Sequence, residues 1–173
     1  LLNELGLAPD ARLIAVAPVD RHRVRSWPLP RFAEAVARIA GLQNAKVAVL
    51  GTPGQRDIVQ PFLDRLPGGT LDLVGKTSIR ELVALLRRAS LVLANDSAPL
   101  HLATALGVPV VGVFGPTNPV RARPYGPRHR VVRHTLPCSP CERRDCRNVN
   151  QYECLTGVDV DQVVAAAQSV MAS

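Results

Sequence analysis

Aromatic residues are scarce in this sequence, whose 173 residues include three Phe, two Tyr and one Trp. Proteins that bind single-stranded nucleic acid stack bases on aromatic side chains, and this sequence has few residues that could form such a stacking surface. No apolar run approaches the roughly 20 residues that cross a bilayer. The start of the chain lacks the basic region and the cleavage site of a signal peptide. These absences argue against a single-strand binder, a membrane-spanning protein and a secretory precursor.

The sequence also lacks an initiator Met, and residues 1–7 are typical of the last turn of a helix followed by a loop. We therefore expect the chain to be a piece cut from a longer protein. Its length fits one domain that can bury a sizeable core. Hydrophobic residues make up 47% and charged residues 20%, which is ordinary for a globular protein.

Lys and Arg outnumber Asp and Glu by 21 to 14, which gives a net charge of +7. Such a balance favours anionic partners, such as phosphates, nucleic acid or an acidic membrane surface. The alternative is a solvated basic surface without a specific partner. Charge alone leaves both interpretations open.

Short apolar segments alternate with longer segments of helical period along most of the chain, which predicts strands alternating with helices. Repeated units of this kind predict a Rossmann-like α/β fold, with a parallel sheet and helices on both faces. Ser78, followed three residues later by Glu81, predicts a capping box. We expect strands at 12–17, 46–50, 71–74, 91–94, 109–114 and, within the loop-rich segment 115–150, at 130–133, and helices at 30–41, 55–66, 78–88, 97–106 and 160–171.

Ligands in such folds bind beyond the carboxyl ends of the strands. Residues 95–101, Asn-Asp-Ser-Ala-Pro-Leu-His, follow the fourth predicted strand and open the next helix. Free N–H groups at a helix start bind anions, and small residues let a phosphate come close. Ser97 and His101 are four residues apart on the predicted helix, so both side chains can face the ligand-binding edge of the sheet. The alternative is structural, with Asp96 as a helix N-cap and His101 as a hydrogen-bonded packing residue.

Two further loops belong to the same predicted edge. Residues 114–119, Phe-Gly-Pro-Thr-Asn-Pro, follow the fifth strand, although plain turn chemistry suits them equally well. Residues 20–28 follow the first strand and carry four cationic or potentially cationic side chains, Arg21, His22, Arg23 and Arg25. Guanidinium groups clamp a diphosphate bidentately, and the alternative is a solvated basic loop. No loop matches G-x-G-x-x-G or G-x-x-x-x-G-K-[ST], so a dinucleotide oxidoreductase and a P-loop ATPase are not supported.

Four motifs in this order resemble the C-terminal half of glycosyltransferase family 9, the ADP-heptose:lipopolysaccharide heptosyltransferases. They are the basic-x-Trp-Pro element at 25–28, Gly-Lys-Thr-Ser at 75–78, and the loops at 95–101 and 114–119. Together they cover nearly the whole chain. The resemblance implies the GT-B architecture of two Rossmann-like domains. Residues 1–173 would then form a single donor-binding domain, and the N-terminal acceptor domain would be absent from this chain.

The resemblance also assigns roles to residues of these motifs. A basic residue on the donor phosphates corresponds to Arg25, and the place where the main chain meets the adenine corresponds to Thr77. No residue of this chain is expected to be catalytic, because the family's general base belongs to the N-terminal domain. The implied substrate-binding residues are Arg25, Thr77, Ser78, Asp96, Ser97, Ala98, His101 and Thr117.

Three departures from the family pattern concern the donor site. Ala98 stands where the family usually has Gly, so the backbone is less free to approach a phosphate. Val19 follows Pro18 where a Gly is expected. Gln55 stands at the position of an acidic residue that commonly contacts the ribose, although Asp57 is close by. These departures do not change the expected fold, but they leave the identity of the nucleotide-sugar donor open.

The implied reaction is inverting transfer of heptose from ADP-heptose to an acceptor hydroxyl of the lipopolysaccharide inner core. The N-terminal base would deprotonate that hydroxyl, while Arg25 and the helix N–H groups would stabilise the charge growing on ADP. Neither a divalent metal nor another cofactor is implied for this chemistry. The enzyme is expected to be cytoplasmic, with peripheral contact to the inner membrane, and this chain alone is expected to be inactive.

All four cysteines lie in one segment, as Cys138, Cys141, Cys146 and Cys154. A C-x2-C pair followed by two more Cys can supply a tetrahedral thiolate zinc site, although the longer gaps are not those of a usual second knuckle. Free thiols and a disulfide formed on isolation are the alternatives, and a cytosolic setting keeps thiols reduced. The same segment carries basic residues that are candidates to meet acidic lipid or lipopolysaccharide phosphates, namely Arg143, Arg144 and Arg147.

Two other functions fit parts of the sequence. A different GT-B enzyme, such as another nucleotide-sugar transferase or an epimerase, would share the fold and differ in its nucleotide. A basic zinc-bearing module that binds nucleic acid would use the charge and the cysteines, but it leaves residues 95–101 without a role. We expect the partners to be the donor, the lipopolysaccharide-core acceptor and the N-terminal domain, and not nucleic acid.

Overall fold

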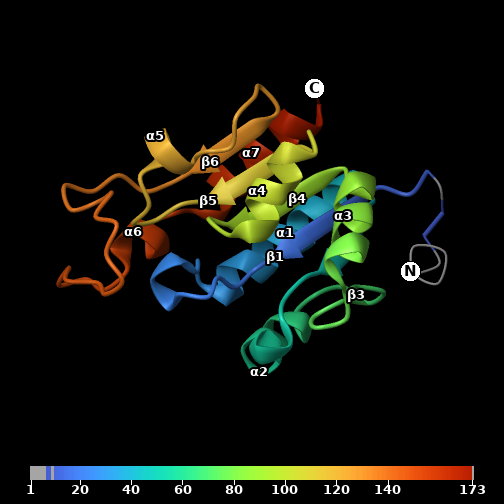
Figure 1. The fold of residues 1–173 in the computed structure, drawn as a ribbon, viewed down its shortest axis with the longest axis horizontal. Helices are drawn as coiled ribbons and strands as arrows, with labels where there is room; N and C mark the ends of the chain where they lie inside the picture. The colour runs from blue at the N-terminus through green and yellow to red at the C-terminus, as the bar shows by residue number, and fades with distance from the viewer. Residues whose placement is uncertain (1–6, 9, 173) are drawn as a thin grey trace.

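In the computed structural model, six parallel strands form one sheet with helices on both faces (Figure 1). The structure describes residues 7, 8 and 10–172. The helical turn expected over residues 1–7 therefore lies outside the described residues, except for Leu7. The strands are β1 (Leu13–Ala17), β2 (Lys46–Val49), β3 (Leu71–Asp72), β4 (Leu91–Asn95), β5 (Val110–Val113) and β6 (His129–Val132).

The strand order is β3-β2-β1-β4-β5-β6, and every neighbouring pair is parallel. The predicted α/β fold is confirmed, including the strand within the loop-rich segment. The third strand is shorter than predicted and ends at Asp72. The reason is local, because the carboxylate of Asp72 accepts the Val74 N–H at 3.2 Å and turns the chain away from the sheet.

Five helices of eight or more residues cover the sheet within the described residues, close to the predicted segments. The predicted capping box at the start of α3 is confirmed, with Ser78 as the N-cap and Glu81 as its partner. Four shorter helical turns were not predicted, because three or four residues give no periodic signal. The longer helices are α1 (Leu29–Gln43), α2 (Arg56–Leu63), α3 (Ile79–Arg88), α4 (Ala98–Ala105) and α7 (Val160–Met171), and the shorter ones are η1 (Arg23–Arg25), η2 (Pro53–Gln55), α5 (Pro119–Ala122) and α6 (Glu153–Thr156).

Alternate residues of each strand point to two separate apolar layers. In β1, Ile14 and Val16 join the core formed with α1, α2 and α7, whereas Leu13, Ala15 and Ala17 join the core formed with α3 and α4. Figure 1 shows α3 and α4 in front of the sheet and α1 and α7 behind it. Since both faces are covered, the central strands β1, β4 and β5 are fully buried, as in other parallel sheets.

Gly112 sets how closely α4 approaches the sheet. A Cβ atom at this position of β5 would lie 2.5 Å from Leu100 Cδ1 and 2.9 Å from Phe114 Cε2. Only a glycine leaves room for Leu100 to pack directly on β5, which brings the first turn of α4 to the carboxyl edge of the sheet. No helix in the described part of the chain combines the length and the apolar character that a membrane span requires.

Candidate functional site

The strand order creates a switch point between β1 and β4. The chain leaves β1 for α1 on one face of the sheet, and it leaves β4 for α4 on the other face. Loops that diverge in this way open a crevice at the carboxyl edge, which is where open α/β sheets bind ligands. In Figure 1 this edge lies at the left, where the arrows of β5 and β6 point.

Asn95, the last residue of β4, ties the loop after β1 to the sheet. Its Oδ1 accepts a hydrogen bond from the Trp27 N–H at 2.9 Å, and its Nδ2 donates to the Pro18 carbonyl at 2.7 Å. The side chain is fully buried, so both bonds are shielded from water. The Trp27 ring packs against Phe32, and its Nε1 donates to the Val158 carbonyl at 3.3 Å. Segment 18–27 is therefore fixed at both ends above the crevice.

Asp96 is the centre of the polar cluster in the crevice. Its Oδ2 accepts a hydrogen bond from Thr117 Oγ1 at 2.6 Å and lies 3.7 Å from Arg25 Nη1. Its Oδ1 lies 3.1 Å from His101 Nε2. Because an ionised carboxylate only accepts hydrogen bonds, Nε2 carries the proton in this contact. The Asp96 carboxylate, which is 7% exposed, thus holds three of the predicted site residues, and these come from η1, from α4 and from the loop after β5.

The start of α4, next to Asp96, carries two donors without a partner in the described part of the chain. Ser97, not Asp96, occupies the N-cap position, so the alternative of Asp96 as a helix cap is wrong. The Ser97 hydroxyl makes no capping bond and has no hydrogen-bond partner, although the residue is only 8% exposed. Pro99 has no N–H, and the N–H groups of Leu100 and His101 bond to the Ser97 carbonyl. The Ala98 N–H is left as the first-turn donor for an anion.

Arg25 and His101 flank this helix start with donors of their own. Among the described residues, the Arg25 guanidinium pairs only with Asp96, and the side chain is 41% exposed, so most of its N–H groups are available to a ligand. The Nδ1 atom of His101 has no partner there either, and the ring is held in place through Nε2. Of the basic residues on the loop after β1, the structure shows an ion pair with Asp96 for Arg25. A diphosphate clamp formed by this loop stays a prediction.

The segment that carries Thr77 and Ser78 lies three strands away along the same edge, after β3. With about 4.8 Å between neighbouring strands, this places it roughly 14 Å from the end of β4. The Ser78 hydroxyl is used by the helix cap, where it donates to Glu81 Oε2 at 2.7 Å. Gly75 holds the turn before it at φ +73, and a Cβ atom there would lie 3.0 Å from Pro53 Cα.

Gln55, which replaces the expected acidic residue, lies between these two ends of the crevice. Its Oε1 accepts the Thr52 N–H at 2.9 Å, and its Nε2 donates to the Val19 carbonyl at 3.2 Å. The amide therefore connects the loop after β2 to the loop after β1. A carboxylate at this position would lose the second of these bonds, because it has no N–H to donate.

An ion-pair group supports the segment beneath Thr77. Arg56 donates two hydrogen bonds to the Asp72 carboxylate at 2.9 and 3.0 Å, and Lys76 donates one at 3.0 Å. Partial burial acts to raise the pKa of Asp72, but these bonds and the Val74 N–H outweigh it and hold the pKa at about 2. The arrangement fixes the end of β3, from which the segment with Thr77 departs.

The four cysteines line one cavity of about 630 Å³, next to Val24 and Pro116. They are free thiols, and burial together with the three neighbouring thiols raises the pKa of Cys154 to about 11. Within the described residues, no three Cys, His, Asp or Glu side chains converge to hold a metal ion. The described thiols are therefore not arranged as a four-ligand site in this structure, and zinc binding by Cys138, Cys141, Cys146 and Cys154 stays a prediction. The thiols surround the cavity and bond to separate neighbours instead, as when Cys146 Sγ accepts the Tyr152 N–H at 3.2 Å.

The fold is that of a GT-B-type glycosyltransferase domain. A sequence model of glycosyltransferase family 9 (heptosyltransferase) matches residues 4–151. The chain therefore belongs to glycosyltransferase family 9, and the resemblance found in its motifs is confirmed.

Individual relatives agree with this assignment. The lipopolysaccharide core heptosyltransferase OpsX of Haemophilus influenzae is 33% identical over 121 residues, which span 69% of this chain and 35% of that protein. A glycosyl transferase family 9 structure from Veillonella parvula is 26% identical, with a TM-score of 0.86, and covers 98% of this chain and 48% of its own. The ADP-heptose lipopolysaccharide heptosyltransferase II structure from Escherichia coli, 20% identical with a TM-score of 0.81, shares the fold over 98% of this chain and 49% of its own.

The chain spans about a third of the length of the curated relatives it matches and about half of the related structures. The sequence predicts Asp96, Ser97, Ala98 and His101 on one loop and Thr117 on a second loop of the same edge, and the structure joins the two loops and Arg25 through Asp96. Sequence reasoning missed the role of Asn95, which is the first residue of the motif. Its position at the end of a buried strand was the available signal, because a buried amide there needs partners.

We expect Asp72→Asn to destabilise the chain by about 1 kcal/mol near neutral pH, a value reduced for the partial exposure of the group. The folded-state pKa of Asp72 is lowered, so its contribution is present above the ordinary value of 3.8 and is lost as the pH falls toward 2. Denaturant unfolding of the unaltered chain and of Asp72→Asn at about pH 6 and about pH 3 measures the difference between their free energies of unfolding. This difference should be smaller at the lower pH. Asp10→Asn, at an exposed position, is the control, and a gap independent of pH would contradict the ion-pair account.

We expect Asn95→Ala to lower the free energy of unfolding by about 3 kcal/mol, because it leaves the Trp27 N–H and the Pro18 carbonyl buried without partners. Asn150→Ala, at an exposed position, should change stability by less than about 0.5 kcal/mol. Urea unfolding followed by Trp27 fluorescence measures both variants. Equal stability of the two variants would show that Asn95 does not hold the loop.

Proposed function

We propose that this chain is the donor-binding half of a heptosyltransferase that transfers heptose from ADP-heptose to the lipopolysaccharide inner core. The start of α4 carries the proposal. There a buried hydroxyl of Ser97 and the N–H of Ala98 are unused, and Arg25 and His101 flank them. Family membership supports the heptose and the acceptor, and the unused donors support a phosphate-bearing ligand.

The proposed donor lies along the carboxyl edge of the sheet. Its adenine rests near the main chain of Thr77, and its diphosphate rests on Ser97, Ala98, Arg25 and His101. The separation of roughly 14 Å between the two positions, set by three strand spacings, suits an extended nucleoside diphosphate. Its sugar then points toward Thr117, on the β5 side of the diphosphate.

The site residues divide into those that contact the donor and those that position them. Asp96 cannot itself bind a diphosphate, since both are anionic, so its role is to hold Arg25, His101 and Thr117. Ser78 acts through the cap of α3, which fixes the segment with Thr77. Ala98 contributes its N–H, and its methyl group, where the family usually has Gly, limits how closely the backbone approaches a phosphate.

The proposed reaction is an inverting displacement at the anomeric carbon of the heptose. A carboxylate of the N-terminal domain takes the proton of the acceptor hydroxyl, the hydroxyl oxygen bonds to the anomeric carbon, and ADP leaves. Arg25 and the Ala98 N–H stabilise the negative charge that grows on the leaving phosphate. No metal or other cofactor takes part in this proposal. This chain alone binds the donor and transfers nothing, because the base and the acceptor domain lie elsewhere.

We expect calorimetry to detect ADP binding by this chain, with ADP preferred over UDP. Ser97→Ala removes a hydroxyl that has no partner in the unliganded chain, so stability should change by less than about 0.5 kcal/mol. The same variant should bind ADP roughly tenfold more weakly, because a hydrogen bond to a charged phosphate is lost.

Ser78→Ala is the matched control and should show the opposite pattern. It loses the cap of α3, which costs about 1 kcal/mol of stability. Because Ser78 only supports the segment whose main chain meets the adenine, its loss should lower ADP affinity by no more than about twofold, far less than Ser97→Ala. If Ser97→Ala binds ADP as the unaltered chain does, the phosphate site is wrong. A preference for UDP would instead favour another GT-B enzyme, and no ADP binding by either this chain or a longer one with its N-terminal domain would refute the proposed function.

We also infer peripheral contact with the inner membrane through the cysteine-bearing loop. Arg143, Arg144 and Arg147 are exposed on it, and Val149 is 96% exposed. Each cation near an anionic bilayer contributes about 1 kcal/mol, so replacing all three by Ala should weaken binding to phosphatidylglycerol vesicles by roughly a hundredfold. Co-sedimentation measures this, with phosphatidylcholine vesicles as the control. Unchanged binding of the triple variant would exclude this surface.

A further inference from the structure

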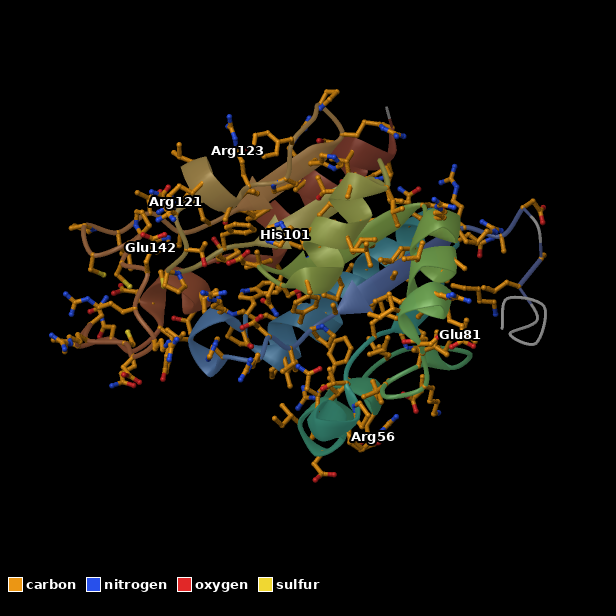
Figure 2. All side chains as sticks on the ribbon, in the orientation of Figure 1. Arg56, Glu81, His101, Arg121, Arg123 and Glu142 are labelled. Carbon is orange, nitrogen blue, oxygen red and sulfur yellow. The ribbon has the colours of Figure 1, made fainter. Side chains whose placement is uncertain are left out.

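A groove of about 370 Å³ begins at His101 and runs along α4. The opposite wall is the segment that starts with α5, and it contributes Arg121, Arg123 and Tyr125. None of the described residues that line the groove is acidic. Figure 2 shows His101, Arg121 and Arg123 on the same side of the molecule, where α4 and α5 lie.

The two arginines of the groove have free hydrogen-bonding capacity. Arg121 uses Nη1 to contact both carboxylate oxygens of Glu142 at 3.2 Å, which leaves its other guanidinium N–H groups available. The Arg123 guanidinium makes no hydrogen bond or ion pair with any residue that the structure describes. Both side chains are exposed, so the local field at the groove is positive and unneutralised except by Glu142.

The backbone beneath these side chains is fixed. Asn118 caps α5 through its side chain, which accepts the Val120 N–H at 2.9 Å. The N–H groups of Arg121 and Arg123 bond to the carbonyls of Asn118 and Pro119. Pro124, between Arg123 and Tyr125, is buried and anchors the segment. The cationic groups are therefore presented from a rigid support, which lowers the entropic cost of binding a ligand.

Tyr125 gives the groove an aromatic surface. It is one of only two Tyr in the chain, and it is 73% exposed. An exposed aromatic ring offers an apolar face for the C–H groups of a sugar and a hydroxyl for its polar groups. A ligand that combines a sugar ring with an anionic group would use both Tyr125 and the arginines.

The groove lies beyond the diphosphate, on the side away from the nucleotide. This step rests on the proposed function, in which the donor occupies the edge from Thr77 to Ser97. His101 separates the two regions, since its Nε2 is held by Asp96 at 3.1 Å while the ring also lines the groove. A ligand in the groove would therefore sit next to the sugar end of the donor, where an acceptor must approach.

We propose that this groove binds a phosphate group carried by a sugar of the acceptor glycan. Arg121 and Arg123 contact the phosphate oxygens, because guanidinium groups match them bidentately. Tyr125 packs against the sugar that bears the phosphate. The donor-binding domain thereby contributes directly to positioning the acceptor.

The test uses glucose 6-phosphate as the probe and the chain saturated with ADP, so that the donor site is already filled. We expect the probe to bind with one site and to shift the amide signals of Thr104 and Tyr125 in nuclear magnetic resonance spectra. Arg123→Ala should lower the affinity for glucose 6-phosphate by about tenfold and leave the affinity for ADP unchanged to within about twofold. Arg87→Ala, which removes an exposed Arg from the far end of α3, is the matched control and should leave both affinities unchanged.

Two further arms separate the phosphate from the sugar. Inorganic phosphate should bind more weakly than glucose 6-phosphate, and glucose should bind more weakly still. Tyr125→Ser should lower the affinity for glucose 6-phosphate and leave the affinity for inorganic phosphate unchanged. Equal binding of inorganic phosphate and glucose 6-phosphate would overturn the assignment to a glycan. Competition between the probe and ADP, or equal effects of Arg123→Ala and Arg87→Ala, would overturn the groove as a separate site. Failure of the proposed function would appear differently, as the loss of ADP binding itself.

Discussion

The site depends on two adjacent side chains at the end of β4, which connect loops that the chain otherwise keeps far apart. Asn95 is buried and holds the loop after β1 through Trp27 and Pro18. Asp96 then holds Arg25, which that loop presents, together with His101 and Thr117. Because a buried amide and a buried carboxylate are costly without partners, the same contacts that satisfy them also fix the geometry of the crevice. Stability and site formation are therefore coupled at this point.

One hydroxyl is left out of this network. Ser97 lies between Asp96 and Ala98 at the start of α4, and its Oγ has no partner although the residue is nearly buried. This buried hydroxyl without a partner is the observation behind the proposal that a ligand completes the site. The anion preference of a helix start, the Arg25 guanidinium and the positioned His101 all favour the same ligand chemistry, which is a phosphate.

Much of the fold followed from the sequence, because alternating apolar runs and helical periods are local signals. The strand at 130–133 and the capping box of Ser78 and Glu81 are examples. The site followed only in part. Its loops were predicted from their places after strands, but Arg25 was one of four basic residues, and its selection required the family motif. The pairing of Asp96 with Thr117, 21 residues further on, is a tertiary contact that no local pattern contains.

The cysteines also show that local sequence patterns do not determine tertiary arrangement. Their spacing suggested a zinc site, yet spacing does not determine where thiols point, and in the structure they surround a cavity. The residues of α5 likewise gave no periodic signal, so the groove beside His101 emerged only when α5 was placed against α4. In both cases the decisive information is the direction of side chains on segments too short or too irregular for sequence patterns.

The most direct test of the account is a crystal structure of this chain with ADP. The account predicts a phosphate oxygen within about 3 Å of both Ser97 Oγ and the Ala98 nitrogen, with the Arg25 guanidinium on the same diphosphate and Asp96 still bonded to His101 and Thr117. ADP bound elsewhere, such as in the cysteine-lined cavity, or a diphosphate that contacts neither Ser97 nor Arg25, would contradict it.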